Sequence, residues 1–382
     1  MTDNNENKVL NVPHLRFPEF SGEWKMATFG DIAKGFDYGM NAAAKSFDGN
    51  NKYIRITDID EVSSQYLYDD VVSPDGELED RYLVKENDIL LARTGASTGK
   101  SYLYRNSDGK LYFAGFLIRA NIYKHNSYFV FSQLHTLRYK KWISVMSARS
   151  GQPGINSQEY ASFPVYTTSL QEEDKIATFL KLLDERIITQ NKIIEKLQSL
   201  IKGIAQHCIK ESTSGNTYVK LGDICQITTG KLDANAQVDN GIYPFFTCAE
   251  QPFKIDSFAF DTEALLISGN GANLGYINYY KGKFNAYQRT YVLDLFSENI
   301  QYIKWALKVL LPKRIAIEKS SSNTPYIVLS TLTDLRLPIP CKSKQSFIAN
   351  LMQSLERKLS NQIAQYDSYN YLKQYLLRQM FI

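Results

Sequence analysis

The sequence has few residues of the kinds that bind metal ions or form disulfides. Among 382 residues there are only four cysteines and four histidines. The cysteines lie far apart without a Cys-x-x-Cys pair, and the histidines show no zinc-type spacing. We therefore expect reduced, mostly buried cysteines and no metal site. The eight residues are Cys208, Cys225, Cys248, Cys341, His14, His125, His135 and His207.

The sequence also lacks a long hydrophobic run and a strong charge of either sign. No stretch of about 18 apolar residues occurs, and the polar start MTDNNENKVL has no signal-peptide core. We expect a soluble, cytoplasmic protein with no membrane partner. The net charge of +4 is mildly basic, which permits a nucleic-acid partner without requiring one. The length predicts two or three domains.

Complete catalytic motifs are missing as well. The stretch ARTGASTGKSYLY ends like a phosphate-binding P-loop, but Gly95 stands one residue too close to Gly99. Pro74–Asp75 and Asp108–Lys110 imitate the Pro-Asp…Asp/Glu-x-Lys pattern of magnesium nucleases. Both segments contain Asp-Gly, which is typical of turns, and the second half of the chain has neither. We expect no catalytic residues, and a magnesium-dependent nuclease is the weaker alternative.

The chain contains an internal repeat, in which one sequence pattern occurs twice. WKMATFGDIAKG, from Trp24, corresponds to YVKLGDICQITTG, from Tyr218, and NDILLARTGASTGKSYL corresponds to EALLISGNGANLGYI. YASFPVYTTSLQEEDKIATFL corresponds to LTDLRLPIPCKSKQSFIANLM, in each case an apolar strand with a proline followed by a helix. The aligned loop residues are Gly95, Ala96 and Gly99 with Gly271, Ala272 and Gly275.

The duplication explains the P-loop-like stretch. The second copy has no Gly-Lys-Ser, so the two loops share only glycines, which permit positive φ and close backbone approach. Each loop is therefore predicted to be a tight strand–turn–strand that presents polar side chains. The aromatic-rich segments that follow predict a strand pair in each copy, with hairpin tips at residues 106–109 and 281–283.

Each copy ends in a long helical segment with apolar residues at alternating spacings of four and three, the heptad pattern of paired helices. The pattern repeats at a constant offset of 172 residues, and a polar position recurs within it, Gln362 on Gln190. Lys373 falls on Ile201, so the contact is expected to loosen there. The predicted seam includes Ile176, Leu180, Leu183, Ile187, Ile194 and Leu197 in the first helix and Ile348, Met352, Leu355 and Leu359 in the second.

These patterns predict a mixed α+β fold. Two pseudo-symmetric α/β domains are separated by two long antiparallel, coiled-coil-like helices, because neither helix can bury its apolar stripe alone. A dimer through either helix is the alternative arrangement. The expected boundaries are 1–166 for the first domain, 167–212 for the first helix, 213–341 for the second domain and 342–382 for the second helix.

From His14 to Ile382 the chain resembles the specificity subunit of type I restriction–modification enzymes. The resemblance rests on PHLRFPEFSGEWKMATFGDIA, YIRITDID, LLARTGASTGK, SARSGQPGINSQEYASFPV, LGDICQITTG, GIYPFFTCAE and LLISGNGANLG, and on their order and duplication. It implies two target-recognition domains, each reading half of a bipartite site in double-stranded DNA. It further implies that the helices set the gap between the half-sites and dock two methyltransferase subunits.

The resemblance also implies that the chain is non-catalytic and needs no cofactor. S-adenosylmethionine, ATP and magnesium are expected on partner subunits, which perform adenine-N6 methylation, and on restriction/translocase subunits, which perform ATP-driven cleavage. The sequence agrees, because the Asn/Asp-Pro-Pro-Tyr/Phe motif of adenine methyltransferases requires adjacent prolines and none occur. The nearest stretch, Tyr243-Pro244-Phe245-Phe246, lacks the polar first residue.

Candidate DNA contacts are polar and basic side chains on the predicted loops, which can reach phosphates and base edges. Tyr38, Asn41, Gln288 and Arg289 are weaker candidates. The alternative function is a two-ended protein scaffold whose loops bind protein and not DNA. The DNA-contact candidates are Arg93, Thr94, Ser97, Thr98, Lys100, Lys140, Lys141, Arg149 and Gln152 in the first copy and Asn270, Asn273, Gln288, Arg289, Lys313, Arg314, Lys319 and Asn323 in the second.

Overall fold

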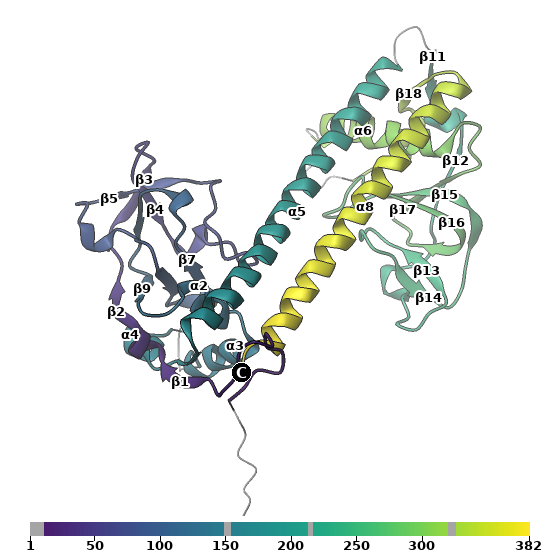
Figure 1. Cartoon of the computed structure of the whole chain (residues 1–382). Helices are drawn as coiled ribbons and strands as arrows, with labels where there is room; N and C mark the ends of the chain where they lie inside the picture. The colour runs from purple at the N-terminus through teal and green to yellow at the C-terminus, as the bar shows by residue number, and fades with distance from the viewer. Residues whose placement is uncertain (1–10, 149–153, 213–216, 320–325) are drawn as a thin grey trace, which may run out of the picture. The chain divides into compact units, whose positions relative to one another are not determined.

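A computed structural model describes residues 11–148, 154–212, 217–319 and 326–382 (Figure 1). Contacts divide the chain into two compact units. Unit 1 is Met1–Lys192 with Ala364–Ile382, and unit 2 is Ile193–Ile363. The helices α5 (Leu170–Glu211) and α8 (Lys342–Gln379) each contribute residues to both units.

Unit 1 is built on a four-stranded sheet in the order β2-β9-β6-β7, and three strand pairs surround it. The pairs are β1–β10, β3–β5 and the parallel pair β4–β8. The strands are β1 (Lys25–Thr28), β2 (Ala33–Tyr38), β3 (Ala43–Ser46), β4 (Lys52–Ile54), β5 (Val72–Asp75), β6 (Asp88–Ala92), β7 (Ser101–Leu103), β8 (Leu111–Phe113), β9 (Leu117–Ile122) and β10 (Pro164–Thr167). The helices are α1 (Phe29–Ile32), α2 (Ser127–Gln133), α3 (Leu137–Met146) and α4 (Ser157–Ala161), with short 3-10 turns η1 (Ile56–Asp58), η2 (Asp80–Tyr82), η3 (Gly95–Ser97) and η4 (Asn106–Asp108).

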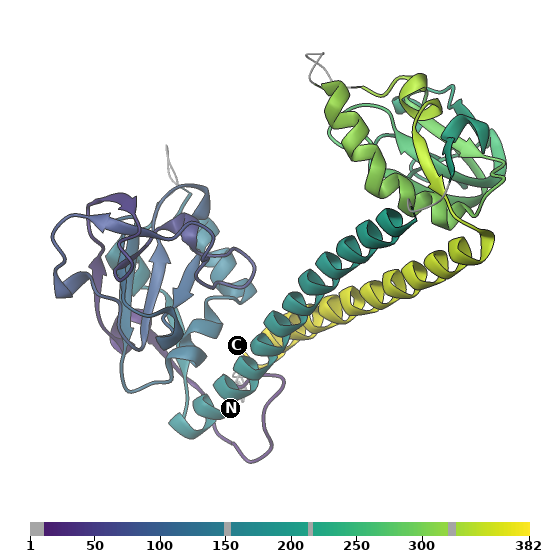
Figure 2. The same cartoon turned by 90° about the horizontal axis from the view of Figure 1, so that it is seen from above.

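Unit 2 is built on a six-stranded sheet in the order β12-β17-β15-β16-β13-β14, with the separate pair β11–β18. Helix α6 (Ile300–Lys319) lies along one face of this sheet (Figure 2). The strands are β11 (Thr217–Lys220), β12 (Gln226–Thr229), β13 (Tyr243–Phe246), β14 (Phe253–Ile255), β15 (Phe260–Ser268), β16 (Ile277–Ala286), β17 (Thr290–Asp294) and β18 (Arg336–Ile339). The remaining elements are α7 (Leu329–Thr333) and the 3-10 turns η5 (Leu221–Asp223) and η6 (Ala234–Ala236).

The central strand of each unit is buried on both faces, which explains its unbroken apolar sequence. In β6, Ile89 and Leu91 belong to the core shared with helices α2 and α3, whereas Leu90 faces a second cluster on the opposite side. In β15, Leu265 and Leu266 divide between two clusters in the same way. Because side chains alternate along a strand, both units place helices on one face of the sheet and aromatic-rich loops and strands on the other.

The predicted duplication is confirmed at the level of single hydrogen bonds. The N–H of Gly99 donates to Ala92 O at 3.0 Å, and the N–H of Gly275 donates to Ser268 O at 2.8 Å. The pairs β1–β10 and β11–β18 are antiparallel in both units, and each precedes its long helix. The two copies therefore share their backbone scaffold.

Most residues of the predicted heptad seam are buried. Among the seam residues, Leu183, Leu355 and Leu359 are half-buried and the others are buried. In unit 1, Asp184 of α5 pairs with Lys373 of α8 at 2.7 Å. Two residues further along α5, Arg186 reaches Tyr369 at 3.3 Å, so the sequence numbers run in opposite directions and the helices are antiparallel (Figure 1). Lys373, expected to loosen the seam, is instead held by an ion pair.

Each unit is completed by the end of the other copy's helix. In unit 1, Leu376, Leu377, Met380 and Phe381 belong to the same core as Trp24. In unit 2, residues 172 positions earlier do the same: Ala205 and Ile209 belong to the buried core, and Ile204 and Cys208 pack against it. Lys344 Nζ also donates to Glu211 O at 3.1 Å, so α5 and α8 are antiparallel in unit 2 too.

Two details differ from the sequence prediction. Residues 106–109 form a turn, but β8 pairs with β4 and not with β7, so no hairpin forms there. Residues 281–283 lie inside the long strand β16, where Gly282 has a φ of 130°. In the first copy β8 pairs with the distant strand β4, and in the second residues 281–283 pair with the preceding strand β15. Among the cysteines, Cys341 is exposed and the other three are half-buried, so the expectation of mostly buried thiols is wrong.

Candidate nucleic-acid interface

The glycine-rich loop after β6 is a packing feature of the fold. Gly95 and Gly99 have φ values of 71° and 91°. A Cβ at Gly99 would lie 2.8 Å from a side-chain carbon of Ile143 in α3, and one at Gly275 would lie 2.6 Å from Ile315 in α6. Since both left-handed backbone and close helix approach require glycine here, the interpretation of this loop as a tight turn is confirmed.

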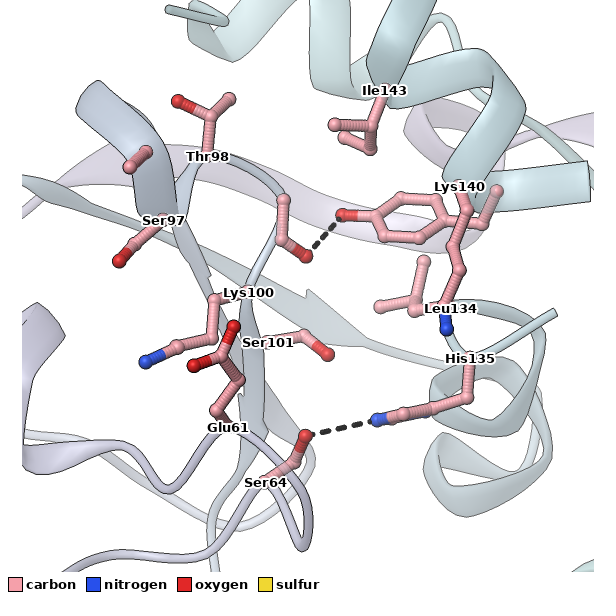
Figure 3. Close-up of a pocket in the computed structure, with 13 residues that line it drawn as sticks. Glu61, Ser64, Ser97, Thr98, Lys100, Ser101, Leu134, His135, Lys140 and Ile143 are labelled. Atoms are coloured by element: carbon pink, nitrogen blue, oxygen red, sulfur yellow. Dashed lines mark hydrogen bonds between the residues drawn. The ribbon is translucent and has the colours of Figure 1, made fainter. Parts of the chain in front are cut away.

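Four of the sequence candidates line one pocket of about 260 Å³ in unit 1 (Figure 3). Lys100 lies on one side, where its Nζ donates to Ile59 O at 3.1 Å. Lys140 is exposed and approaches from α3. The carboxylate of Glu61 lies beside Lys100 in the figure. The other two candidates are Ser97 and Thr98, and the hydroxyl of Thr98 donates to Gly95 O.

A neutral histidine holds the other wall of this pocket. His135 Nε2 lies 3.0 Å from Ser64 Oγ, and its Nδ1 lies 2.9 Å from Phe131 O (Figure 3). Burial, together with the positive charge of Lys373, lowers the pKa of His135 to about 4. The histidine therefore ties the loop at Ser64, which has a φ of 54°, to the helical layer. The two lysines are the cationic groups that line the pocket.

Arg93 lies in a different place from Lys100. Its guanidinium carbon sits 4.9 Å from the centre of the Tyr38 ring, and its Nη1 donates to Gly115 O at 3.4 Å. These residues line a second pocket of about 530 Å³ together with Asn41 and the exposed ring of Phe116. The structure thus brings Arg93 together with two of the weaker candidates, Tyr38 and Asn41. Thr94 bridges to Gly154 beside them, and Lys141 is exposed on α3.

In unit 2, two candidates hold a loop. Asn270 Oδ1 accepts a hydrogen bond from Cys248 Sγ at 3.0 Å, and Asn273 Nδ2 donates to Cys248 O at 3.0 Å. Gln288 and Arg289 are exposed at the adjacent turn before β17. These four residues come from two loops, and Cys248 on a third loop links the two, since its Sγ also lies 3.6 Å from Arg289 O.

The remaining candidates lie on or beyond α6. Lys313 is exposed, and Arg314 is half-buried. Lys220 and, more weakly, Arg314 hold the pKa of Asp334 below its usual value. Lys319 is the last residue of α6, but its side chain lies outside the described residues. Arg149, Gln152 and Asn323 also lie outside them. Individual DNA contacts remain predictions.

The nuclease-like segments have structural roles. Asp108 is buried, and its carboxylate accepts hydrogen bonds from Tyr68 at 2.7 Å and from Tyr102 at 2.5 Å. Asp75 is exposed in β5 and pairs with Lys45 at 3.5 Å. Within the described ranges, no three His, Cys, Asp or Glu side chains gather as metal ligands would. In the same part of the chain, every helix is too short or too polar to cross a bilayer.

Two copies of one α/β scaffold, each with exposed cationic loops that differ between copies, define a protein with two similar binding units. The family model for the type I restriction modification DNA specificity domain matches residues 21–199 and again 213–366. The chain therefore belongs to the family of type I restriction–modification specificity subunits and carries two copies of its domain, as predicted.

Relatives in sequence carry the same designation. The EcoDI specificity subunit of Escherichia coli is 44% identical over 137 residues, which are 36% of this chain and 30% of that protein. The chain thus matches less than a third of that relative's length. The MjaVIII specificity subunit of Methanocaldococcus jannaschii is 22% identical over an alignment that covers 92% of this chain and 89% of that protein.

Solved structures show the same fold. The S subunit of a type I restriction–modification system from M. genitalium has a TM-score of 0.69 at 17% identity, and covers 97% of this chain and 99% of that one. A chain from a structure that describes complex assembly and conformational transition of the type I restriction–modification system has a TM-score of 0.55 at 15% identity. The match covers 94% of this chain and 97% of that one.

The sequence did not single out Phe116, which lines the second pocket beside Arg93. Its ring is 62% exposed between β8 and β9, beside Arg93. The aromatic-rich segment in which Phe116 lies has a sequence typical of strands, and most of its rings are buried. The sequence alone does not show which of these rings is exposed, because that depends on how β9 pairs with β6. The duplication offered one signal, because the corresponding turn in the second copy contains Gln288 and Arg289.

Proposed function

We propose that this chain is the DNA-reading subunit of a type I restriction–modification complex and is itself non-catalytic. Each unit reads one half of a bipartite site in double-stranded DNA. The observation that carries the proposal is the family match to both halves of the chain, together with loops that occupy the same scaffold positions but differ in sequence. Two independent readers on one chain need this combination of shared backbone and different side chains.

Phosphate contacts are assigned to the lysine-lined pocket of unit 1. Lys100 and Lys140 line this pocket from opposite sides, together with Ser97, and ammonium groups neutralise phosphates without reading sequence (Figure 3). Replacement of either lysine by alanine is expected to weaken binding to all sequences alike and to reduce the salt slope by about one. Lys25→Ala, an exposed lysine in β1, is the matched control.

The helices α5 and α8 are proposed to set the gap between half-sites and to dock two methyltransferase subunits. Restriction/translocase subunits join the same complex. S-adenosylmethionine, ATP and magnesium belong to these partners, and this chain needs no cofactor. The proposal is supported by large side chains exposed on the outer face of the helix: on α8, Tyr371 is 78% exposed and Tyr375 is 56% exposed. Large exposed apolar side chains are typical of surfaces that bind other proteins.

Methylome sequencing of a host with and without this chain tests the function. A split adenine-methylation motif that depends on the chain is the expected result. Replacement of residues 1–166 by those of a relative should then change one half of the motif and leave the other unchanged. A scaffold that binds only proteins would leave the methylome unchanged, and this outcome would overturn the proposal.

A further inference from the structure

The two units present a guanidinium group at the same corner of the scaffold, although the arginines stand at different positions of the repeat. In unit 1 the N–H of Arg93 donates to Phe116 O at 3.1 Å. In unit 2 the equivalent bond runs from the N–H of Gly269 to Arg289 O at 2.8 Å. Arg93 therefore corresponds to Gly269, and Phe116 corresponds to Arg289. In unit 1 the arginine directly follows β6, the first strand of the pair, whereas in unit 2 it directly precedes β17, the second strand.

The arginine of unit 1 is held in place without being neutralised. The Tyr38 ring supports its guanidinium at 4.9 Å, and the Tyr38 hydroxyl accepts the N–H of Ser157 at 3.2 Å, which fixes the ring. Within the described ranges, no carboxylate lies within 4.0 Å of this guanidinium. By contrast, Arg55 in the same pocket is paired with Asp58 at 2.7 Å. Nη1 of Arg93 makes one long hydrogen bond, to Gly115 O at 3.4 Å, and stacking leaves the other in-plane donors available to a ligand.

The surroundings of Arg93 fit a base edge better than a phosphate. Phe116 is 62% exposed at the pocket's mouth, and Met40 and Ala42 contribute further apolar surface. An exposed aromatic ring offers nothing to a phosphate, but it can contact the methyl group of thymine. An arginine with free donors can bind the O6 and N7 acceptors of guanine together. The apolar and the donor groups lie next to each other, as they would for neighbouring base pairs.

We infer that this corner is the base-reading site of unit 1, where Arg93 binds guanine and Phe116 contacts the 5-methyl group of an adjacent thymine in the major groove. Tyr38 is a positioning residue for Arg93. The inference rests on the proposed function and extends it to named residues and base chemistry. In unit 2 the same corner carries Arg289 with Gly269 opposite, so that unit reads a different half-site from the same scaffold position.

The test uses the full complex of this chain with its methyltransferase partner and the site found by methylome sequencing. Guanines in the unit 1 half-site are replaced one at a time by 7-deazaguanine, which lacks N7, and thymines by uracil, which lacks the methyl group. At one position each, wild-type affinity should fall, by about 5- to 150-fold for the guanine. The loss should disappear in Arg93→Ala for the guanine and in Phe116→Ala for the thymine.

Controls separate this site from other roles. Met26→Ala removes a 65%-exposed side chain from β1 and should leave every substitution effect unchanged. Arg289→Ala should relax only the other half-site. If Arg93→Ala weakens binding to all sequences equally, Arg93 contacts phosphate and the inference is wrong. It is also wrong if both variants keep the wild-type motif and affinity. If the wild-type complex shows no motif at all, the proposed function fails instead.

Discussion

Phe381, which follows helix α8, is expected to stabilise unit 1, although it lies far in the sequence from the other residues of that core. Phe381 is 5% exposed, and its ring lies 6.1 Å from Trp24 and 5.3 Å from Phe129. Replacement of a buried phenylalanine by alanine costs about 3–5 kcal/mol through lost burial and the cavity left behind. Because Phe381 lies beyond the last turn of α8, its neighbours can partly close the cavity, so the lower value of about 3 kcal/mol applies.

Amide hydrogen exchange resolves this effect unit by unit. About 3 kcal/mol corresponds to roughly a hundredfold faster exchange through global opening of unit 1. Phe381→Ala should therefore reduce protection about a hundredfold in β6 of unit 1, while β15 of unit 2 keeps its protection. Phe347→Ala, which removes a 67%-exposed ring from α8, is the matched control and should change neither strand.

Three results would contradict the reasoning. Protection of β6 that is unchanged in Phe381→Ala would show that the aromatic contacts contribute little. An equal loss in β15 would show that the two units open together. An equal effect of Phe347→Ala would mean that the ring acts through general helix stability and not through the core of unit 1.

Three further outcomes are expected. Gly99→Ala should destabilise unit 1 by about 1–3 kcal/mol in urea unfolding because the new Cβ meets Ile143 and φ is 91°, whereas Gly35→Ala, with open space, should not. Burial lowers the pKa of His135 to about 4 in the folded protein, so protonation of this histidine favours the unfolded chain below its unfolded pKa near 6.5. The free energy of unfolding should therefore fall by up to about 3 kcal/mol as the pH drops from 6.5 to 4. Thermal melting measured against pH should show a smaller fall in His135→Gln. Four residues inserted after Gln190 should change the gap in the methylation motif or abolish methylation, while any motif that remains keeps both half-sites.

The candidate interface shows where prediction from sequence stops. The glycine turn at Gly95 and Gly99 could be predicted because its backbone requirement is local and occurs twice. The division of its neighbours into two pockets could not, since Lys100 and Lys140 share a pocket only through the packing of α3, and Arg93 lies over Tyr38 only through the pairing of β2 within the sheet. The hairpins predicted at residues 106–109 and 281–283 were wrong for the same reason. In the first copy, pairing of β8 with the distant strand β4 outweighed the local turn signal, and in the second, residues 281–283 continue β16 along the preceding strand β15.

The sequence by itself determined the duplication, the two strand-then-helix endings and the buried seam, because periodicity and repetition are properties of the chain that need no third dimension. Only the tertiary structure decided that Phe381 completes the core around Trp24, that Lys373 finds Asp184, and that Phe116 stands beside Arg93. Such contacts join residues far apart in the sequence. They depend on the packing of whole elements, and no local pattern encodes it.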